Sequence, residues 1–358
     1  QYVLPSGEIR RARYGDKSLD ATIDLGDVIT AVSAQAPSTI LVETNTWSDL
    51  AVANGGCVTP VAVQIADATR RAIDASTFAM KIVMLWPFLG CNIVTPRVPL
   101  IDRLGKGLAT NVGFVDADFT QALGLQGDGN KYLNSLAKPN ELGATEAAGG
   151  LGWWEVNIAA GLAGANPEPI GSYKQNTTPD NRFSLDLRAA NYRFAWGTAG
   201  SGADFVGAPG DGHFYGQGVN PTLRQLFFNG ALKATATTTT DVVSDLNMLL
   251  MGCDTGIAGI RPWSGRGFLA YMTDGTMTEA EVGAFHALLL KYLVNPKLTG
   301  IPVRFEGGPG QETFPDPDAP ANAEETDCEA CLNSISTDRT TGEVSVDRNT
   351  GFVSQARL

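Results

Sequence analysis

Histidine is scarce in this 358-residue sequence, which contains only His213 and His286. His286 falls within a helix-like segment, where a core role is favoured over catalysis, and His213 lies in a glycine-rich stretch. No serine occupies a G-x-S-x-G elbow, so the sequence offers no frame for a serine hydrolase. We therefore expect no nucleophilic catalysis and no cofactor.

Charge is also sparse and predominantly negative. Charged residues make up 18% of the chain, the formal net charge is −12 and the isoelectric point is about 4.7. An anionic membrane or a nucleic acid would repel such a chain at long range. The longest apolar run, 78–89, contains Lys81 and Pro87 and is too short to cross a bilayer. We therefore expect neither a nucleic-acid partner nor insertion into a membrane.

Cysteines are few and odd in number: Cys57, Cys91, Cys253, Cys328 and Cys331. No disulfide framework can be read from such a set, and folding in a bacterial cytoplasm is expected. The C-x-x-C spacing at 328–331 would supply two of the four ligands that a structural zinc site requires. A pair of free thiols is the favoured interpretation, and a metal or disulfide shared across an assembly is the alternative.

The beginning of the chain shows no apolar segment of the secretory type, and residues 1–45 read as an extended, partly basic arm. Thr59 and Pro60 suit the start of a helix over about 60–75. A second helix is expected from about 77, because Phe78, Ile82 and Leu85 share one helical face. We therefore assign 46–90 to a helical hairpin.

From 91 to 295 short β-prone segments alternate with turn clusters, and glycine is abundant, with 41 residues. Asn229-Gly230 is the strongest hairpin signal, since both residues tolerate positive φ. Thr278 and Glu281 precede an amphipathic segment, which predicts a capped helix over about 278–293. The expected fold class is mainly β: an antiparallel β-sandwich or jelly roll closed by a C-terminal helix.

Residues 296–358 form a Pro/Gly/acidic linker followed by a nine-residue repeat, 338–346 and 347–355. Each unit reads as a turn plus a strand, and two such units cannot bury a core alone. Val344, Val346 and Val353 alternate with polar residues, which suits strand addition to another subunit. The alternative is a disordered tail with accidental similarity.

Several short segments resemble a recurrent unit of bacteriophage tail and capsid-associated proteins. In that unit a concanavalin-A-like (laminin-G or lectin-type) sandwich opens at an aromatic-Pro-Phe-x-Gly step and closes with a strand and a helix. The segments that carry the resemblance are 84–90, 99–102, 123–133, 227–230 and 266–281. The resemblance implies a concanavalin-A-like fold, placement on a virion and a surface able to bind glycans.

The glycan-cleaving enzymes of this fold class carry an E-x-D-x-x-E pattern, and the sequence has no such match. Glu155, after Trp153-Trp154, is a lone acid. Of these two tryptophans one ring could face outward and stack on a sugar, although burial of both rings is the favoured alternative. Asp116 and Asp118 could bind a hard cation, but a solvated strand face is the favoured interpretation, so any metal remains unknown.

These observations predict a structural protein of a phage particle, a tail fibre, head fibre or capsid decoration protein displayed on the virion exterior. Its partners would be other virion proteins, further copies of itself with a trimer favoured, and host-surface carbohydrate. The alternatives are a carbohydrate-binding module of a non-viral surface protein and, with less support, a glycan depolymerase.

Overall fold

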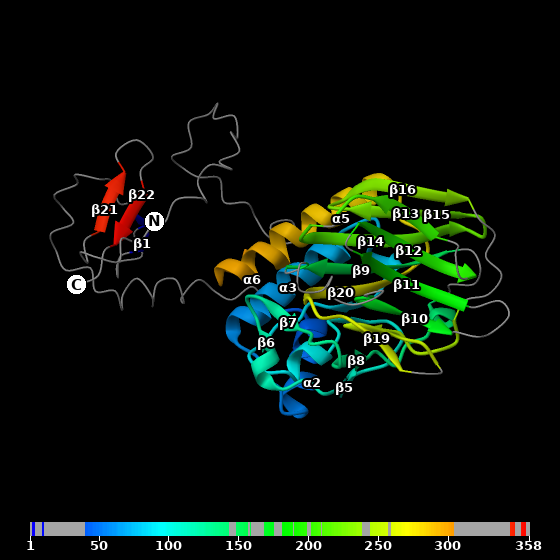
Figure 1. Ribbon diagram of the computed structural model, residues 1–358. Helices are drawn as coiled ribbons and strands as arrows, with labels where there is room; N and C mark the ends of the chain where they lie inside the picture. The colour runs from blue at the N-terminus through cyan, green and yellow to red at the C-terminus, as the bar shows by residue number, and fades with distance from the viewer. Residues whose placement is uncertain are drawn as a thin grey trace. The chain divides into compact units, whose positions relative to one another are not determined.

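A computed structural model describes residues 40–142, 148–156, 158, 168–174, 181–188, 190–198, 202–208, 210–237, 244–256 and 259–303, and the backbone of four short strands elsewhere (Figure 1). The chain divides into two units, 1–308 and 309–358, which are described separately. Among the described helices, none combines the length and apolar character needed to cross a bilayer.

Two sheets form the body of the first unit. Sheet I has the strand order β16-β15-β14-β9-β20-β3-β4, with β7 also paired to β20 and β6 to β7. Its strands are β3 (Ile82–Trp86), β4 (Ile101–Asp102), β6 (Phe119–Thr120), β7 (Gly124–Gln126), β9 (Gly149–Glu155), β14 (Gly212–Asn220), β15 (Leu223–Phe228), β16 (Ala231–Thr237) and β20 (Arg266–Asp274). All of these pairings are antiparallel.

Sheet II has the order β13-β12-β11-β10-β17-β8-β5 and is antiparallel along this path. Its strands are β5 (Thr110–Val112), β8 (Tyr132–Asn134), β10 (Ile170–Lys174), β11 (Asn181–Arg188), β12 (Asn191–Thr198), β13 (Gly202–Val206), β17 (Leu249–Leu250), β18 (Gly252–Asp254) and β19 (Ile260–Pro262). β18 joins β10 through one parallel pair and forms a hairpin with β19.

The main core fills the space between the two sheets. Sheet I contributes Trp86, Trp153 and Phe214, and sheet II contributes Phe183 and Phe194, all of them fully buried. Because alternate residues of a strand point to opposite faces, each sheet presents one set of side chains to this layer. The two antiparallel sheets confirm the predicted β-sandwich.

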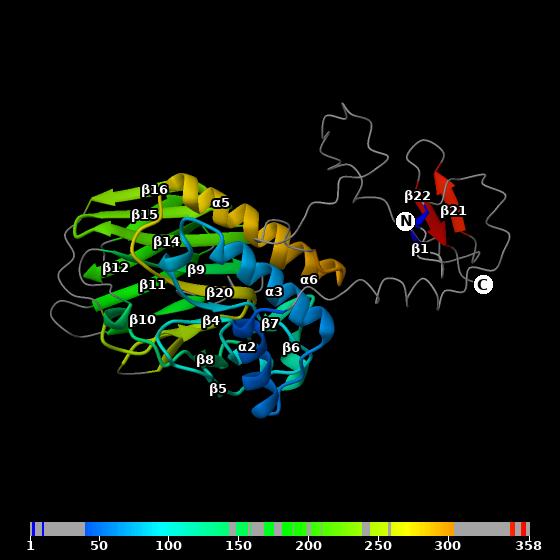
Figure 2. The same cartoon turned by 180° about the vertical axis from the view of Figure 1, so that it is seen from behind.

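Helices cover the other face of sheet I (Figures 1 and 2). They pack on a second buried layer, in which strand residues such as Leu85 and Tyr271 meet helical residues such as Ile65 and Phe285. The helices are α2 (Val42–Ala53), α3 (Pro60–Asp74), α5 (Glu279–Leu289), its π-helical continuation η6 (Leu290–Val294) and α6 (Asn295–Thr299). Sheet I is therefore buried on both faces.

Two helix starts confirm the sequence-based expectations. The Thr59 hydroxyl accepts a hydrogen bond from the Ala62 amide at 3.1 Å, with Pro60 in the first turn of α3. Thr278 and Glu281 form a capping box, in which the Glu281 amide donates to the Thr278 hydroxyl and the Thr278 amide donates to the Glu281 carboxylate. Asn229 and Gly230 have φ of 50° and 77°, as a type I′ turn between β15 and β16 requires.

The predicted second helix from about 77 is wrong. A 3-10 turn, η2 (Ala79–Lys81), leads into β3, which pairs with β20 and β4. The run Ile82–Trp86 is apolar throughout because sheet I is buried on both faces, and such a short run does not distinguish a buried strand from a helix. The helical pair instead consists of α2, which was not expected, and α3. Three further 3-10 turns are η3 (Thr95–Arg97), η4 (Asp116–Asp118) and η5 (Pro139–Glu141).

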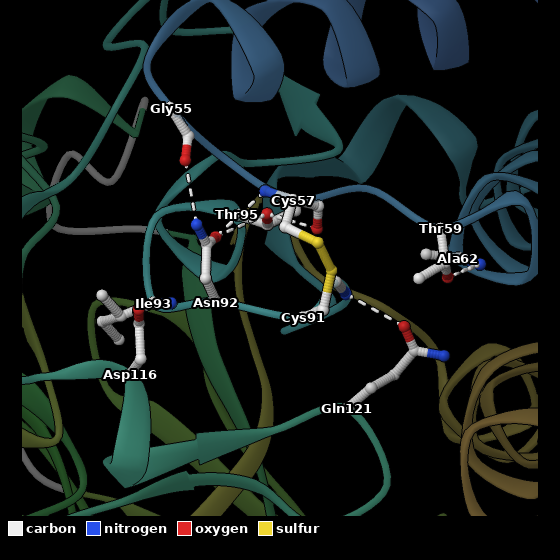
Figure 3. Close-up of a disulfide and its surroundings, with 11 residues drawn as sticks. Gly55, Cys57, Thr59, Ala62, Cys91, Asn92, Ile93, Thr95, Asp116 and Gln121 are labelled. Atoms are coloured by element: carbon white, nitrogen blue, oxygen red, sulfur yellow. Dashed lines mark hydrogen bonds between the residues drawn. A yellow bond between two sulfur atoms is a disulfide. The ribbon is translucent and has the colours of Figure 1, made fainter.

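A disulfide joins Cys57, between α2 and α3, to Cys91, after β3 (Figure 3). The expectation that no disulfide could be assigned is thereby corrected, because two cysteines 34 residues apart have Cα atoms only 5.2 Å apart in the fold. The Asn92 side chain accepts from the Cys57 amide at 3.0 Å and donates to the Gly55 carbonyl at 2.9 Å. This cluster ties the helical layer to the loops of the sandwich.

Two short antiparallel pairs lie at the ends of the chain. β1 (Tyr2–Val3) pairs with β2 (Ile9–Arg10) within the predicted arm. In the second unit β21 (Val344–Asp347) pairs with β22 (Phe352–Gln355), one strand from each nine-residue repeat. The register places Val346 opposite Val353. The predicted docking of Val344, Val346 and Val353 on another subunit stays a prediction.

Candidate functional site

The face of sheet II that points away from the main core carries polar and charged side chains. On β11, Phe183 and Leu185 enter the core, so Arg182, Ser184 and Asp186 point to the opposite face. On β8, Leu133 enters the core, and Tyr132 and Asn134 point the other way. We call this side the outer face of sheet II.

A cavity of about 390 Å³ opens on this face where β8 and β17 meet the β18–β19 hairpin. This volume falls in the range of small-ligand sites. The side chains that line it are Tyr132, Asn134, Leu246, Leu249, Asp254 and Ile260, together with Gly256 and Gly259 of the hairpin turn.

The polar groups of the cavity are held by their own loops. The Asn134 side-chain oxygen accepts from the Leu136 amide at 2.9 Å, and Asp254 Oδ1 accepts from the Gly256 amide at 2.9 Å. An asparagine held in this way keeps two N–H donors on its amide nitrogen, and a carboxylate keeps further acceptor capacity. With the half-buried ring of Tyr132, the wall combines an aromatic surface, a donor and an acceptor.

A buried ionic cluster fixes the hairpin that forms one wall of this cavity. The Glu168 carboxylate accepts from Arg261 of β19 at 2.7 Å and from Arg182 of β11 at 2.5 Å. Both guanidinium groups lie over the Tyr173 ring of β10, 4.5 and 5.0 Å from its centroid. Glu168 therefore links the hairpin to β11, and the Tyr173 ring adds a contact with β10, where the hairpin has a single backbone pair.

A second carboxylate, Asp186, accepts from the same nitrogen of Arg182 at 2.6 Å. Burial, reinforced by the charge of Glu168, raises the pKa of Asp186 to about 6. Burial opposes ionisation of Glu168 as well, but Arg182 and Arg261 outweigh it and lower the pKa of Glu168. Both carboxyl groups are fully buried and bound to Arg182, whereas a glycosidase needs its pair in an open cleft.

The structure confirms the favoured interpretation of Trp153 and Trp154, burial of both rings, and gives no support to the alternative of a glycan-stacking surface. Trp153 is 0% exposed in the core between the sheets, and Trp154 is 6% exposed in the layer beneath the helices. Strand alternation sends the rings to opposite faces, as expected, but the helices cover the face that Trp154 reaches. Glu155 is structural, because its buried carboxylate accepts from the indole N–H groups of Trp153 and Trp263.

His213 and His286 come together, which the sequence did not indicate. Their rings lie 5.4 Å apart and nearly parallel, each also against Trp154, between β14 and α5. His213 Nε2 forms a 2.7 Å hydrogen bond with the Tyr271 hydroxyl. Burial, together with the neighbouring His286, lowers the pKa of His213 well below its ordinary value, and burial also lowers the pKa of His286.

The other candidates gain no support as metal sites. Asp116 and Asp118 lie in the 3-10 turn η4 and not on a strand. The Asp116 carboxylate accepts a hydrogen bond from the Ile93 amide, and Asp118 forms an ion pair with Lys131 at 2.9 Å. Cys328 and Cys331 lie outside the described residues. Within the described ranges, no three His, Cys, Asp or Glu side chains gather so that they could hold a metal ion.

Tyr132 lies within the resembling segment 123–133 but was not singled out, and Asp254 and Asn134 were also missed. Alternation along the strand could have identified Tyr132, because a neighbour of the apolar Leu133 is expected to point to the opposite face of the sheet. Asp254 reaches the cavity through the β18–β19 hairpin, whose position no local pattern reveals.

No protein-family model matches the sequence, and no curated protein matches it. Among solved structures, the chain is similar to the CBM40 of a Ruminococcus gnavus sialidase, with a TM-score of 0.34, 15% identity, and 44% of this chain and 95% of that one covered. It is also similar to the receptor-binding domain of botulinum neurotoxin C/D mosaic serotype, with a TM-score of 0.41, 13% identity, and 60% of this chain and 54% of that one covered.

A third likeness is to domain 4 of an extracellular GH43 arabinanase from Geobacillus stearothermophilus, with a TM-score of 0.35, 13% identity, and 57% of this chain and 98% of that one covered. Each TM-score is below 0.5. The function proposed below therefore rests on the residues of this chain.

The histidine pair predicts a loss of stability in acid. Because the folded state holds His213 neutral while the unfolded chain protonates it below pH 6.5, the free energy of unfolding falls as the pH drops below that value. At pH 5 the loss from His213 can amount to at most about 2 kcal/mol, which is 1.36 kcal/mol for each pH unit below 6.5. Urea unfolding at pH 7.5 and 5.0 measures it.

His213→Phe removes the titrating ring and should therefore shrink the difference in unfolding free energy between the two pH values. Tyr271→Phe is the matched control, since it removes the same hydrogen bond and keeps the titrating ring. An equal pH dependence in His213→Phe and the wild type would contradict this assignment.

Proposed function

We propose that this chain is a non-enzymatic structural protein of a phage particle, displayed on the virion exterior, that binds glycans in the cavity on the outer face of sheet II. The observation that carries the proposal is the cavity itself, where the Tyr132 ring meets the polar groups of Asn134 and Asp254. Aromatic walls with a few placed polar groups are typical of small-ligand sites.

A sugar presents apolar C–H faces and a rim of hydroxyl groups. The Tyr132 ring offers a flat apolar surface for the first, and the Asn134 amide and the Asp254 carboxylate offer a donor and an acceptor for the second. Because both polar side chains are already held by backbone amides of their own loops, binding costs little further ordering of these groups. The site is therefore suited to a hydroxyl-rich ligand.

Three observations support placement on a virion exterior. The segments that resemble phage virion proteins coincide with structural elements of one body, namely β3, β7, β8, the β15–β16 turn and β20. The Cys57–Cys91 disulfide suits an oxidising setting such as a virion surface. The paired strands of the C-terminal repeat leave strand edges to which virion proteins or further copies of the chain can add.

A carbohydrate-binding module of a non-viral surface protein is the second candidate, favoured by the same cavity, which needs no virion to bind a sugar. A glycan depolymerase has less support, since Glu168 and Asp186 are buried and bound by Arg182. The first two candidates differ in the partner of the chain and not in the chemistry of the site.

The binding role is tested on a glycan array with the full chain. Wild-type protein should bind a defined set of oligosaccharides, and Tyr132→Ala should weaken that binding about ten-fold or more through loss of ring contact. Tyr132→Phe keeps the ring and is the matched control, expected to retain most of the affinity. An array on which the correctly folded wild-type chain binds no glycan would contradict glycan binding.

The virion assignment is tested separately by quantitative mass spectrometry of purified phage particles. The chain should be present at a copy number that is an integral multiple of a symmetric set, such as three per attachment point for a trimeric fibre. Detection of the chain only in the soluble fraction of infected cells would instead favour a role outside the particle.

A further inference from the structure

The electrostatics of the cavity indicate which sugars it accepts. We propose that the cavity selects neutral glycans and rejects those that carry a carboxylate, with Asp254 as the residue that determines this specificity. The inference rests on the proposed glycan-binding function and deepens it by naming the ligand class.

Among the lining residues that the structure describes, the only charge is negative. Asp254 is the one carboxylate among the lining residues that the structure describes, and none of those residues is Lys, Arg or His. Its Oδ1 accepts from the Gly256 amide, which fixes the carboxylate at the wall. A bound sugar acid would bring a second negative charge beside it without a cation in the lining to compensate.

Cations near the cavity are already engaged by carboxylates. Arg261 and Arg182 bind Glu168, and Lys174 pairs with Asp245 at 2.9 Å. Recruiting any of these cations to a ligand carboxylate would break an existing ion pair, and for Glu168 it would leave a buried charge with fewer partners.

Two lysines flank the β8 region, and each also faces carboxylates. Lys131 pairs with Asp118 at 2.9 Å and with Asp128 at 3.1 Å. Lys138 lies within electrostatic range of Asp245 and Glu141. Neither lysine belongs to the cavity lining.

Between 143 and 258, the segments outside the described residues contain no Lys, Arg or His in their sequence, whereas they do contain Glu146, Asp180 and Asp241. The charge of the lining and the composition of these segments therefore agree.

The selectivity is tested on an array of paired oligosaccharides. Each neutral glycan is compared with its sialylated or uronate-bearing counterpart. Wild-type protein should prefer the neutral member at least about five-fold, the ratio that one unscreened charge pair at about 4 Å gives in water. Asp254→Asn should bring the acidic-to-neutral ratio close to one, while its side-chain oxygen still accepts from the Gly256 amide.

Asp74→Asn is the control, because it changes the net charge equally on α3, on the other side of sheet I. It should leave the ratio at the wild-type value. A second measurement needs no variant: raising the salt from about 0.05 to 0.5 M shortens the screening length and should narrow the neutral preference of the wild type.

The outcomes separate the two claims. Wild-type binding to acidic glycans as tight as to their neutral partners, or an unchanged ratio in folded Asp254→Asn, would overturn the selectivity while leaving glycan binding intact. Absence of binding to either class would overturn the proposed function and the selectivity with it. Neutral preference that Asp74→Asn also abolishes would show that net charge, and not Asp254, sets the ratio.

Discussion

Burial of sheet I on both faces is the constraint on which the rest of the molecule depends. All five residues of Ile82–Trp86 are aromatic or apolar because β3 contributes to both buried layers. Val83, Met84 and Trp86 lie in the core between the sheets, and Ile82 and Leu85 lie in the layer under the helices. The same constraint places Trp153 and Trp154 in different buried layers and brings His213 of β14 and His286 of α5 against the Trp154 ring. Because helices occupy one side of the sandwich, the outer face of sheet II is the side on which a ligand site can be built.

On the outer face of sheet II, buried ion pairs hold the β18–β19 hairpin in position. Glu168, Arg182 and Arg261 connect a hairpin that has little backbone pairing to the centre of sheet II. A buried ion pair of this kind is weak support for overall stability but strong support for one arrangement of the groups involved, since breaking it leaves an uncompensated charge. The hairpin carries Asp254, so the ionic cluster determines where the cavity wall lies. The position of this wall thus depends on residues that do not line the cavity.

The sequence predicts those parts of the fold that depend on local chemistry. The caps at Thr59 and Thr278 and the turn at Asn229-Gly230 follow from side-chain geometry over three or four residues, and all three are present. β3 was mistaken for a helix, since its apolar run reflects burial from two sides and carries no periodicity. The disulfide and the cavity were not found because they join residues far apart in the chain. For Trp153-Trp154, alternation predicts that the rings reach opposite faces but not what covers each face, so a stacking surface stayed open beside the favoured burial of both rings, which the structure confirms.

The proposed function requires that a ligand binds on the outer face of sheet II. Hydrogen–deuterium exchange of the full chain, with and without a glycan that it binds on an array, tests this directly. Slower exchange is predicted in the peptides that cover 132–136 and 246–260, with no change in α3 or α5. Protection confined to the helical layer, or found nowhere in the sandwich while the glycan is bound, would contradict the site.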